Sequence, residues 1–163
     1  MKTEQLTDLV RDLGSLMMTT FPSGTPSDAN ARPMSVAKVD EDATVYFLTS
    51  SDTSQAHDVR RESEGLCTGQ SKTHYVAMRG SFEVSYDREL IETLWSKMAD
   101  AWFPNGKDDP TVRVITFRPT SAEIWDMSGA KGLRFAFDLA KAWLTNEPPK
   151  KHGDTHAKVD LRH

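Results

Sequence analysis

The sequence predicts a mainly β (α+β) fold, a small antiparallel β-barrel with flanking helices. Six or so short runs rich in β-forming residues follow one another. Most of them are joined by short turns and few by helices, which favours an antiparallel barrel over a doubly wound sheet. The length of 163 residues suits one domain with its own core. We expect that domain to span residues 1–147 and to be followed by a polar, mobile tail at residues 148–163.

The first part of the chain predicts one helix and then a β-hairpin. The helix rests on an apolar stripe at helical spacing, made of Leu6, Leu9, Val10 and Leu13. Gly14 ends it, residues 16–21 are predicted to be extended, and residues 22–30 form a loop rich in Pro, Gly and Ser. Residues 32–39 and 44–49 then predict two antiparallel strands joined by an acidic turn.

A polar turn follows the second of these strands. Thr49, Ser50 and Ser54 lie in the run TSSDTS, and the helical segment QAHDVRRESE comes directly after it. Hydroxyl groups and free backbone N–H groups at the start of a helix can hold an anion such as phosphate. Capping of the helix by Ser54 or Asp52 explains the same residues, and His57 either assists an anion or lies on the surface.

The second half of the chain predicts further strands. Residues 66–70 and 75–84 form a hairpin around a polar turn, and Gly80 marks a bulge or a close backbone approach. Residues 112–117 form a strand that Pro119 ends. The remaining predicted elements are a strand at residues 121–126, which contains Trp125, and an amphipathic helix at residues 133–144.

One segment, residues 87–110, combines a helix with a bulky apolar step. Asp87 caps a predicted helix whose core face consists of Leu90, Ile91, Leu94, Trp95 and Met98. Trp102 and Phe103 follow, before a turn that contains Pro104. Both rings expose a large apolar surface to water unless something covers them. We expect that cover to be the domain's own sheet, a second subunit or a flat ligand.

Composition limits the classes of function. The net charge of −4 gives no broad basic face, so nucleic-acid binding is not expected as the main activity. No segment reaches the length of a membrane helix and the N-terminus is unlike a signal peptide, so we expect a cytoplasmic protein that does not bind membranes. The single cysteine, Cys67, lies in a strand-like run and is expected to be a buried, unreactive thiol.

Motifs with known chemistry are few. The histidines lack the spacing of metal ligands, so a dedicated zinc site is not expected. Asp108 and Asp109 precede Pro110, and turn formation explains this pair better than a catalytic dyad does. The sequence contains neither the glycine motifs of nucleotide-binding folds nor the serine motif of hydrolases. Residue patterns alone therefore predict a barrel and a polar turn, but no reaction.

The order of several motifs resembles a known family. The most specific motif is the run W-F-P-x-G-x-D-D-P at residues 102–110. The others are Arg32-Pro33-Met34, Tyr46 to Ser50 with Ser54, Gly80, Leu94-Trp95, and Ala122-Glu123-x-Trp125-Asp126. Together they resemble the general stress protein branch of the pyridoxamine-phosphate-oxidase-like flavoproteins over nearly the whole chain. The resemblance implies a split barrel that binds FMN as a homodimer, with the flavin in a cleft at the subunit interface.

The resemblance also implies which residues surround the flavin. They are Arg32, Met34, Ser35, Val36, Thr49, Ser50, Ser54, Gln55, His57, Trp102 and Trp125. Arg32 would lie near the ribityl-phosphate end, and Trp125 would reach the flavin from the opposing subunit. Trp102 and Phe103 would help to cover the cleft. Plain packing in the core or in the dimer is the alternative for both tryptophans.

One departure from the family pattern concerns the phosphate. Members usually place a lysine after the serine equivalent to Ser54, whereas Gln55 and Ala56 stand here, and Ala37 occupies the place of another basic residue. A phosphate without a fixed cation loses charge-assisted hydrogen bonds worth roughly 1.5–3 kcal/mol each. The basic residues that remain nearby in the sequence are Lys38, His57 and Arg60.

Two functions stay open at this point. One is a flavin-binding stress-type protein, either a low-activity FMN oxidoreductase or a flavin carrier or sensor, with FAD as the alternative cofactor. The other is a non-enzymatic dimeric scaffold of the same fold that has lost or weakened flavin binding. Pyridoxamine-phosphate oxidation is not expected, because the basic residues that bind its substrate are not recognisable after Trp125.

Overall fold

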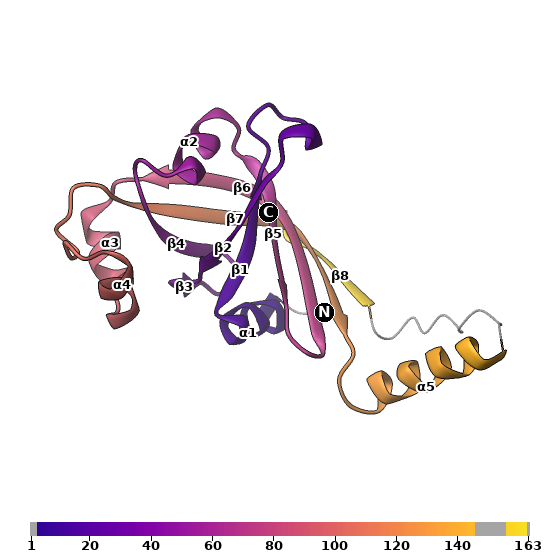
Figure 1. The fold of residues 1–163 in the computed structure, drawn as a ribbon. Coiled ribbons are helices and arrows are strands. Elements are labelled where there is room, and N and C mark those ends of the chain that lie inside the picture. The colour runs from indigo at the N-terminus through magenta and orange to yellow at the C-terminus, as the bar shows by residue number, and fades with distance from the viewer. Residues whose placement is uncertain (1–2, 146–155, 163) are drawn as a thin grey trace.

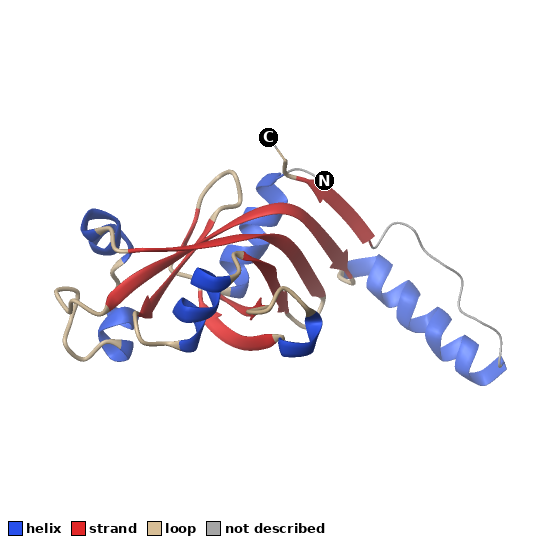
Figure 2. Ribbon diagram, turned by 90° about the horizontal axis from the view of Figure 1, so that it is seen from above, coloured by secondary structure: helices blue, strands red, loops and turns tan. Residues whose placement is uncertain are grey.

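An antiparallel sheet forms the centre of the fold. The computed structural model describes residues 3–145 and 156–162, and in this part of the chain eight strands form one sheet. Seven of them follow the order β2-β1-β5-β6-β7-β4-β3, and β8 pairs with β7 beside that path. The sheet curls on itself, with shorter helices beside it and one long helix that projects from one end (Figure 1; Figure 2). This architecture confirms the predicted mainly β fold with flanking helices.

The N-terminal elements agree with the sequence except at one junction. Helix α1 (Thr3–Leu13) leads into β1 (Ser15–Thr20), and a 3₁₀ turn, η1 (Pro26–Asp28), precedes β2 (Asn30–Ser35). The prediction of one strand over residues 32–39 is wrong, because β2 pairs with β1 whereas β3 (Lys38–Val39) pairs with β4.

Two consecutive amides show where the chain changes partner between β2 and β3. The Val36 N–H donates to the Gly14 carbonyl at 2.9 Å, and the Ala37 N–H donates to the Tyr46 carbonyl at 2.8 Å. The first bond joins the chain to the residue before β1, and the second joins it to β4, so the two amides bond to different strands' segments. Residues 33–37 are therefore held at the junction between β1 and β4, beside the cavity described below.

The two predicted hairpins are present. β3 and β4 (Val45–Ser50) pair across the acidic turn, and β5 (Glu64–Gln70) pairs with β6 (His74–Ser85). Helix α2 (Ser54–Arg61) lies between the hairpins.

Pro119 lies inside a strand, which corrects the prediction that it ends one. Strand β7 (Val112–Asp126) runs through it, pairing with β6 on one side and with β4 and then β8 on the other. Pro119 stands opposite Gly80, where the register of β6 shifts, so the missing N–H falls at a point where the ladder is already irregular. A Cβ on Gly80 would lie 2.2 Å from the Arg118 carbonyl oxygen. The predicted close backbone approach at Gly80 is thus confirmed.

The predicted single helix at residues 87–98 is two helices. Asp87 caps α3 (Arg88–Leu94) as predicted, because its side chain accepts from the Leu90 N–H at 3.1 Å. Trp95 is extended, and Ser96 caps the second helix, α4 (Lys97–Trp102). Ser96 thus starts a new helix where the apolar pattern continues without a break. As a result Met98 does not join the core face and is exposed.

The C-terminal part contains a helix and a strand. Helix α5 (Gly129–Thr145) covers the predicted residues 133–144. The expectation of a mobile tail from residue 148 onward is wrong at its end, because β8 (His156–Asp160) pairs with β7 and buries Val159. The rest of the expected tail, residues 148–155, lies outside the described residues.

The core fills the inside of the curled sheet. Its largest fully buried side chains on the strands are Leu16, Met18, Phe47, Met78, Ile115 and Phe117. Helix α1 adds Leu6 and Val10, which are also fully buried. Cys67 is buried as predicted, and this burial raises the pKa of its thiol well above the ordinary value. A thiol that stays protonated is a poor nucleophile.

Candidate functional site

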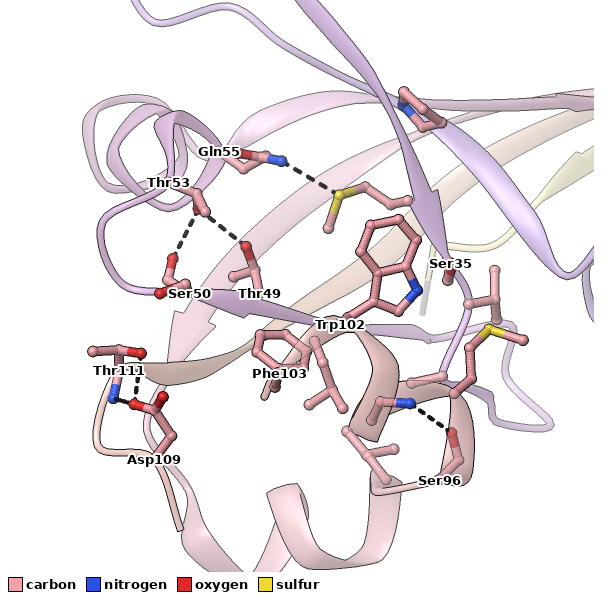
Figure 3. Close-up of a pocket in the computed structure, with 18 of the residues that line it drawn as sticks. Ser35, Thr49, Ser50, Thr53, Gln55, Ser96, Trp102, Phe103, Asp109 and Thr111 are labelled. Atoms are coloured by element: carbon pink, nitrogen blue, oxygen red, sulfur yellow. Dashed lines mark hydrogen bonds between the residues drawn. The ribbon is translucent and has the colours of Figure 1, made fainter. Parts of the chain in front are cut away.

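A cavity of about 460 Å³ lies between the sheet and helix α4. One wall, here called the sheet wall, consists of residues 33–37, the end of β4 and the start of α2. The other, the helix wall, consists of the end of α3, helix α4 and the loop before β7 (Figure 3). The volume falls in the range of sites for drug-sized ligands, about 300–1,000 Å³.

Hydroxyl groups line the sheet wall where β4 ends. Thr53 is the N-cap of α2, and its Oγ1 accepts from the Ala56 N–H at 3.4 Å and donates to the Ser50 carbonyl at 2.8 Å. The Thr49 and Thr53 hydroxyls are 3.0 Å apart. Thr53, and not Ser54 or Asp52, therefore caps the helix. The hydroxyls of the cavity are fixed by these bonds before any ligand arrives.

Residues at the end of β2 form the apolar part of the same wall. Met34 is buried, and its Sδ accepts from Gln55 Nε2 at 3.5 Å. Ser35 is exposed, and Val36 is partly buried against the core. This part of the lining therefore contains a methionine, a serine and a valine.

The helix wall is aromatic and less well covered. Phe103 packs against Trp95, with 5.7 Å between the ring centroids. Trp102 is 70% exposed although it lines the cavity (Figure 3), and Met98 is 61% exposed. The chain's own sheet therefore covers Phe103 but leaves Trp102 open.

The loop before β7 adds one carboxylate to the lining. Asp109 accepts from the Thr111 N–H at 2.8 Å, from the Thr111 hydroxyl at 2.7 Å and from Asn105 Nδ2 at 3.0 Å. The two bonds from Thr111, and then the one from Asn105, lower the pKa of Asp109. Asp108 instead accepts from Arg88 at 2.6 Å, so the two carboxylates act separately in the turn. The interpretation of this pair as turn residues is confirmed.

The structure brings most of the predicted flavin residues to this cavity. Those in its lining are Met34, Ser35, Val36, Thr49, Ser50, Gln55 and Trp102. Those outside it are Arg32, Ser54, His57 and Trp125. Residues that line the cavity but were missed include Thr53, Ser96, Met98, Ala99 and Thr111. The polar run TSSDTS already contained Thr53, and Ser96, a residue type favoured at the N-cap, was the signal for the second helix that brings Ala99 to the cavity.

Arg32 is engaged behind the sheet wall. Its Nη2 lies 3.3 Å from Asp58 Oδ2, and its Nη1 donates to Ser54 Oγ at 2.6 Å. The same Asp58 oxygen accepts from Thr20 and Asn30, each at 2.9 Å. Both side chains of the ion pair are mostly buried. The guanidinium thus ties β2 to α2 and is neutralised by the carboxylate.

The other basic residues named from the sequence also lie away from the lining. His57 is exposed on α2, and Arg60 is exposed one turn further along. Lys38 forms an ion pair with Asp40 at 2.7 Å. Among the described residues, the cavity lining contains Asp109 but neither lysine, arginine nor histidine.

Trp125 lies at the far end of β7. Its ring stacks on His156 of β8 with 4.9 Å between centroids, and His156 Nε2 lies 3.0 Å from Glu123 Oε2. These contacts hold β8 on the sheet. Contact between Trp125 and a flavin of an opposing subunit stays a prediction.

The curled barrel with a hydroxyl-lined cavity at one end defines the class of the protein, a split-barrel fold with a concave ligand site. The family model described as "Pyridoxamine 5'-phosphate oxidase like" matches residues 1–150. The chain belongs to this family.

Named relatives point to the same branch. General stress protein 26 of Bacillus subtilis is 29% identical over 82 residues, which are 47% of this chain and 57% of that protein. The match thus spans little more than half of this curated relative. A crystal structure of a putative general stress protein 26 from Jannaschia sp. CCS1 is 32% identical, covers 97% of both chains and has a TM-score of 0.70.

More distant structures share the fold. A general stress FMN/FAD binding protein from Xanthomonas citri is 21% identical, with 78% of this chain and 90% of that one covered and a TM-score of 0.68. A heme binding protein from Mycobacterium smegmatis is 12% identical over 75% of this chain and 52% of that one, with a TM-score of 0.58. At these identities the likeness concerns the fold alone.

Two further features are absent from the described residues. No cluster of three or more His, Cys, Asp or Glu side chains in this part of the chain has the arrangement of a metal site. No helix in the same part is both long and apolar enough to span a bilayer.

Proposed function

We propose that this protein binds a flavin, FMN in the first instance, in the cavity between the sheet wall and the helix wall. The observation that supports the proposal is the convergence of an apolar strand end, a row of fixed hydroxyls and an aromatic wall on one cavity of suitable volume. A relative of the same fold is described as an FMN/FAD binding protein.

The ring and ribityl parts of FMN fit this lining. An isoalloxazine ring needs apolar or aromatic contact on its faces, which Met34, Val36 and Trp102 offer. Its polar edge and the ribityl hydroxyls need hydrogen-bond partners, and the hydroxyl oxygens of Thr49 and Ser50 offer acceptors that bonds to Thr53 and Asp52 hold in place.

The phosphate fits less well. The lining lacks a basic side chain among the described residues, the guanidinium of Arg32 is neutralised by Asp58, and Asp109 adds negative charge. The hydroxyl protons of Thr53 and Ser50 are already donated to the Ser50 carbonyl and to Asp52, so a phosphate here displaces such bonds or relies on backbone amides, without a fixed cation. We therefore expect the ring to supply most of the affinity and FMN to bind only moderately better than riboflavin.

A bound flavin supplies electron or hydride transfer. The chain's own contribution is to hold the ring in a fixed orientation through the sheet wall and to shield one edge from water with Trp102 and Phe103. The lining contains one carboxylate, Asp109, and its hydrogen bonds lower its pKa and so favour the ionised form. The proposal therefore assigns binding and orientation to this chain and leaves the reaction partner open.

The proposal includes a homodimer with the cavity at the subunit interface. The helix wall supports it, since Trp102 and Met98 stay exposed in the single chain. Apolar side chains of that size at the mouth of a cavity are typical of an interface. FAD is the alternative cofactor, because the mouth is open and a larger flavin can extend out of it.

A second candidate function has its own observation. A lining without a basic side chain suits a dimeric scaffold that no longer retains flavin. In that case the cavity stays as an apolar pocket of the dimer.

Titration separates the two candidates. The full-length protein, freed of bound cofactor, is titrated with FMN, FAD and riboflavin while flavin fluorescence and absorbance are followed. Flavin binding predicts saturation near one flavin per chain, with Kd values for FMN and riboflavin that differ by less than about tenfold, since a fixed cation would separate them by more. Failure of millimolar FMN and riboflavin to bind would leave the scaffold.

A further inference from the structure

Helix α5 has an apolar face that the described chain leaves uncovered. Its most exposed apolar side chains are Leu133 at 76%, Phe137 at 69%, Trp143 at 88% and Leu144 at 80%. Their spacing places them with Ala140 on one side of the helix, whereas Thr145 falls on the other side and Lys141 at the border between the two. The helix projects from the sheet in both views (Figure 1; Figure 2). An exposed apolar face of this size marks an interaction surface.

The chain carries a second uncovered apolar surface at the mouth of the cavity. Met98 and Trp102 on α4 form it, and Phe103 continues it inward. Helices α4 and α5 lie at opposite ends of the sheet (Figure 1; Figure 2). One chain therefore does not cover its own cavity mouth with its own α5, whereas two chains can cover each other's.

Charge favours the same pairing. The α5 segment contains three basic residues and one acidic residue, a net charge of +2, namely Lys131, Arg134 and Lys141 against Asp138. Residues 87–110 around the cavity mouth carry a net charge of −3, from six acidic and three basic residues. Opposite net charges on two segments favour their encounter and disfavour pairing of each segment with itself.

We infer that α5 of a second copy of this chain lies across the cavity mouth, with its apolar face against Met98 and Trp102. The arrangement is reciprocal, so a two-fold axis closes it with each helix covering the other chain's cavity. The inference rests on the homodimer in the proposed function, and it names the segment that completes the site. It does not depend on which ligand the cavity takes.

The size of the surfaces is sufficient for a stable dimer. A standard interface buries about 1,600 Å² in total, and an aromatic side chain buries about 150–250 Å². Phe137, Trp143 and Trp102 each contribute twice in a two-fold dimer, and the leucines of α5 add to them. The contact therefore reaches the standard range without further surfaces.

Cysteine pairing tests the geometry in the full chain. Ala101 on α4 and Ala140 on the apolar face of α5 are both exposed, and Ala→Cys is a small change at each. Chains with Ala101→Cys are mixed with chains with Ala140→Cys and treated with a short bis-maleimide. We expect a covalent dimer in the mixture and little in either variant alone. The native Cys67 is buried and does not interfere.

A control variant reports which face of α5 is engaged. Thr145→Cys lies on the polar face of the same helix, and its mixture with Ala101→Cys should give at least fivefold less covalent dimer. Cross-linking of Ala140→Cys with itself would show that α5 pairs with α5 and would overturn the inference. Equal yields from the Thr145→Cys mixture would overturn it as well.

Sedimentation supplies an independent measurement. We expect the wild-type chain to sediment as a dimer, Phe137→Asp as a folded monomer by circular dichroism, and Thr145→Asp, on the polar side of α5, as a dimer. A monomeric wild type would contradict the inference. Binding of such a monomer to vesicles with anionic lipid would assign the helix to a membrane surface.

Failure of the flavin proposal and failure of the inference about α5 give different experimental results. The cross-linking and sedimentation experiments contain no flavin, and the FMN titration is repeated on the Phe137→Asp monomer. Cross-linked dimers without flavin binding would leave the inference intact and remove the proposed function. Flavin binding by a chain that does not cross-link would support the proposed function and overturn the inference about α5.

Discussion

The two walls of the cavity differ in what holds them in place. The sheet wall lies on a packed core, and its hydroxyls already have partners within the chain, as the 3.0 Å contact between Thr49 and Thr53 shows. The helix wall has a buried side at Ile91 and Leu94 but presents Met98 and Trp102 outward. The sheet wall is therefore ordered by contacts within the chain, whereas the exposed apolar side chains of the helix wall are available to a ligand or a second subunit.

The largest expected effect contrasts one side chain from each wall. Phe47→Ala removes a fully buried ring from β4 and should lower the free energy of unfolding by about 3–5 kcal/mol. Trp102→Ala removes an exposed ring and should cost less than about 0.5 kcal/mol. Urea unfolding followed by circular dichroism measures both, in the Phe137→Asp background so that only packing within one chain contributes. Equal losses would show that the helix wall belongs to the core.

The next effect concerns the polar cluster behind the sheet wall. Asp58→Ala leaves Arg32 and the donors Thr20 and Asn30 without their shared acceptor in a mostly buried place. We expect a loss of about 2–3 kcal/mol in the free energy of unfolding.

Asp8→Ala is the matched control for Asp58→Ala. It breaks the exposed ion pair between Asp8 and Arg11 and should cost less than about 1 kcal/mol. A similar small loss for Asp58→Ala would mean that the cluster does not fix β2 to α2.

A third change restores the cation that the lining lacks. Gln55→Lys places an ammonium group on a residue that lines the cavity at the start of α2. If FMN binds there with its phosphate on this side, its Kd should fall by about 10- to 100-fold, the size of one charge-assisted hydrogen bond, while the Kd of riboflavin stays unchanged. Flavin fluorescence titration gives both constants.

Gln70→Lys controls for the change in net charge. Gln70 is exposed at the end of β5 and does not line the cavity. An equal gain for FMN in both variants would indicate long-range attraction and no phosphate site near residue 55.

The sheet wall could largely be read from the sequence, because its signals are local. Alternating β-forming residues predict β4, and the polar run after it predicts the hydroxyls of Thr49 and Ser50 at a helix start. The break between β2 and β3 was missed because it depends on pairing partners, β1 on one side and β4 on the other. Residues before and after the change of pairing partner, within the range 30–39, have similar β-forming patterns, so the sequence does not mark the break.

The helix wall and the C-terminus were harder to predict for a related reason. Ser96 caps a new helix inside an uninterrupted apolar pattern, so Met98 moved from a predicted core position to the cavity mouth. Pro119 stays in β7 only because Gly80 and its register shift lie opposite. The strand β8 depends on pairing with β7 and on the stacking of His156 upon Trp125. The last two features are contacts between distant residues, whereas the Ser96 cap is local, with the Ala99 N–H donating to Ser96 Oγ at 3.4 Å, and the continuous apolar pattern concealed it.

The smallest expected effect is the pH dependence of stability that Asp109 contributes, in the loop before β7. Three hydrogen bonds, from Thr111 and Asn105, lower the pKa of Asp109. Because the folded state favours the ionised carboxylate, these bonds stabilise the fold above the ordinary aspartate value, about pH 4, and this contribution is lost as the pH falls through the lowered pKa.

Asp109→Asn keeps the shape of the side chain but does not titrate. The difference in urea midpoint between wild type and Asp109→Asn should therefore be constant from pH 7 to pH 5 and shrink below about pH 4. Asp108→Asn provides the comparison, since Asp108 bonds only to Arg88 at the surface among the contacts described and its pair is worth little. A difference for Asp109→Asn that persists at pH 3 would show that geometry, and not the charge of the carboxylate, orders the loop beside the cavity.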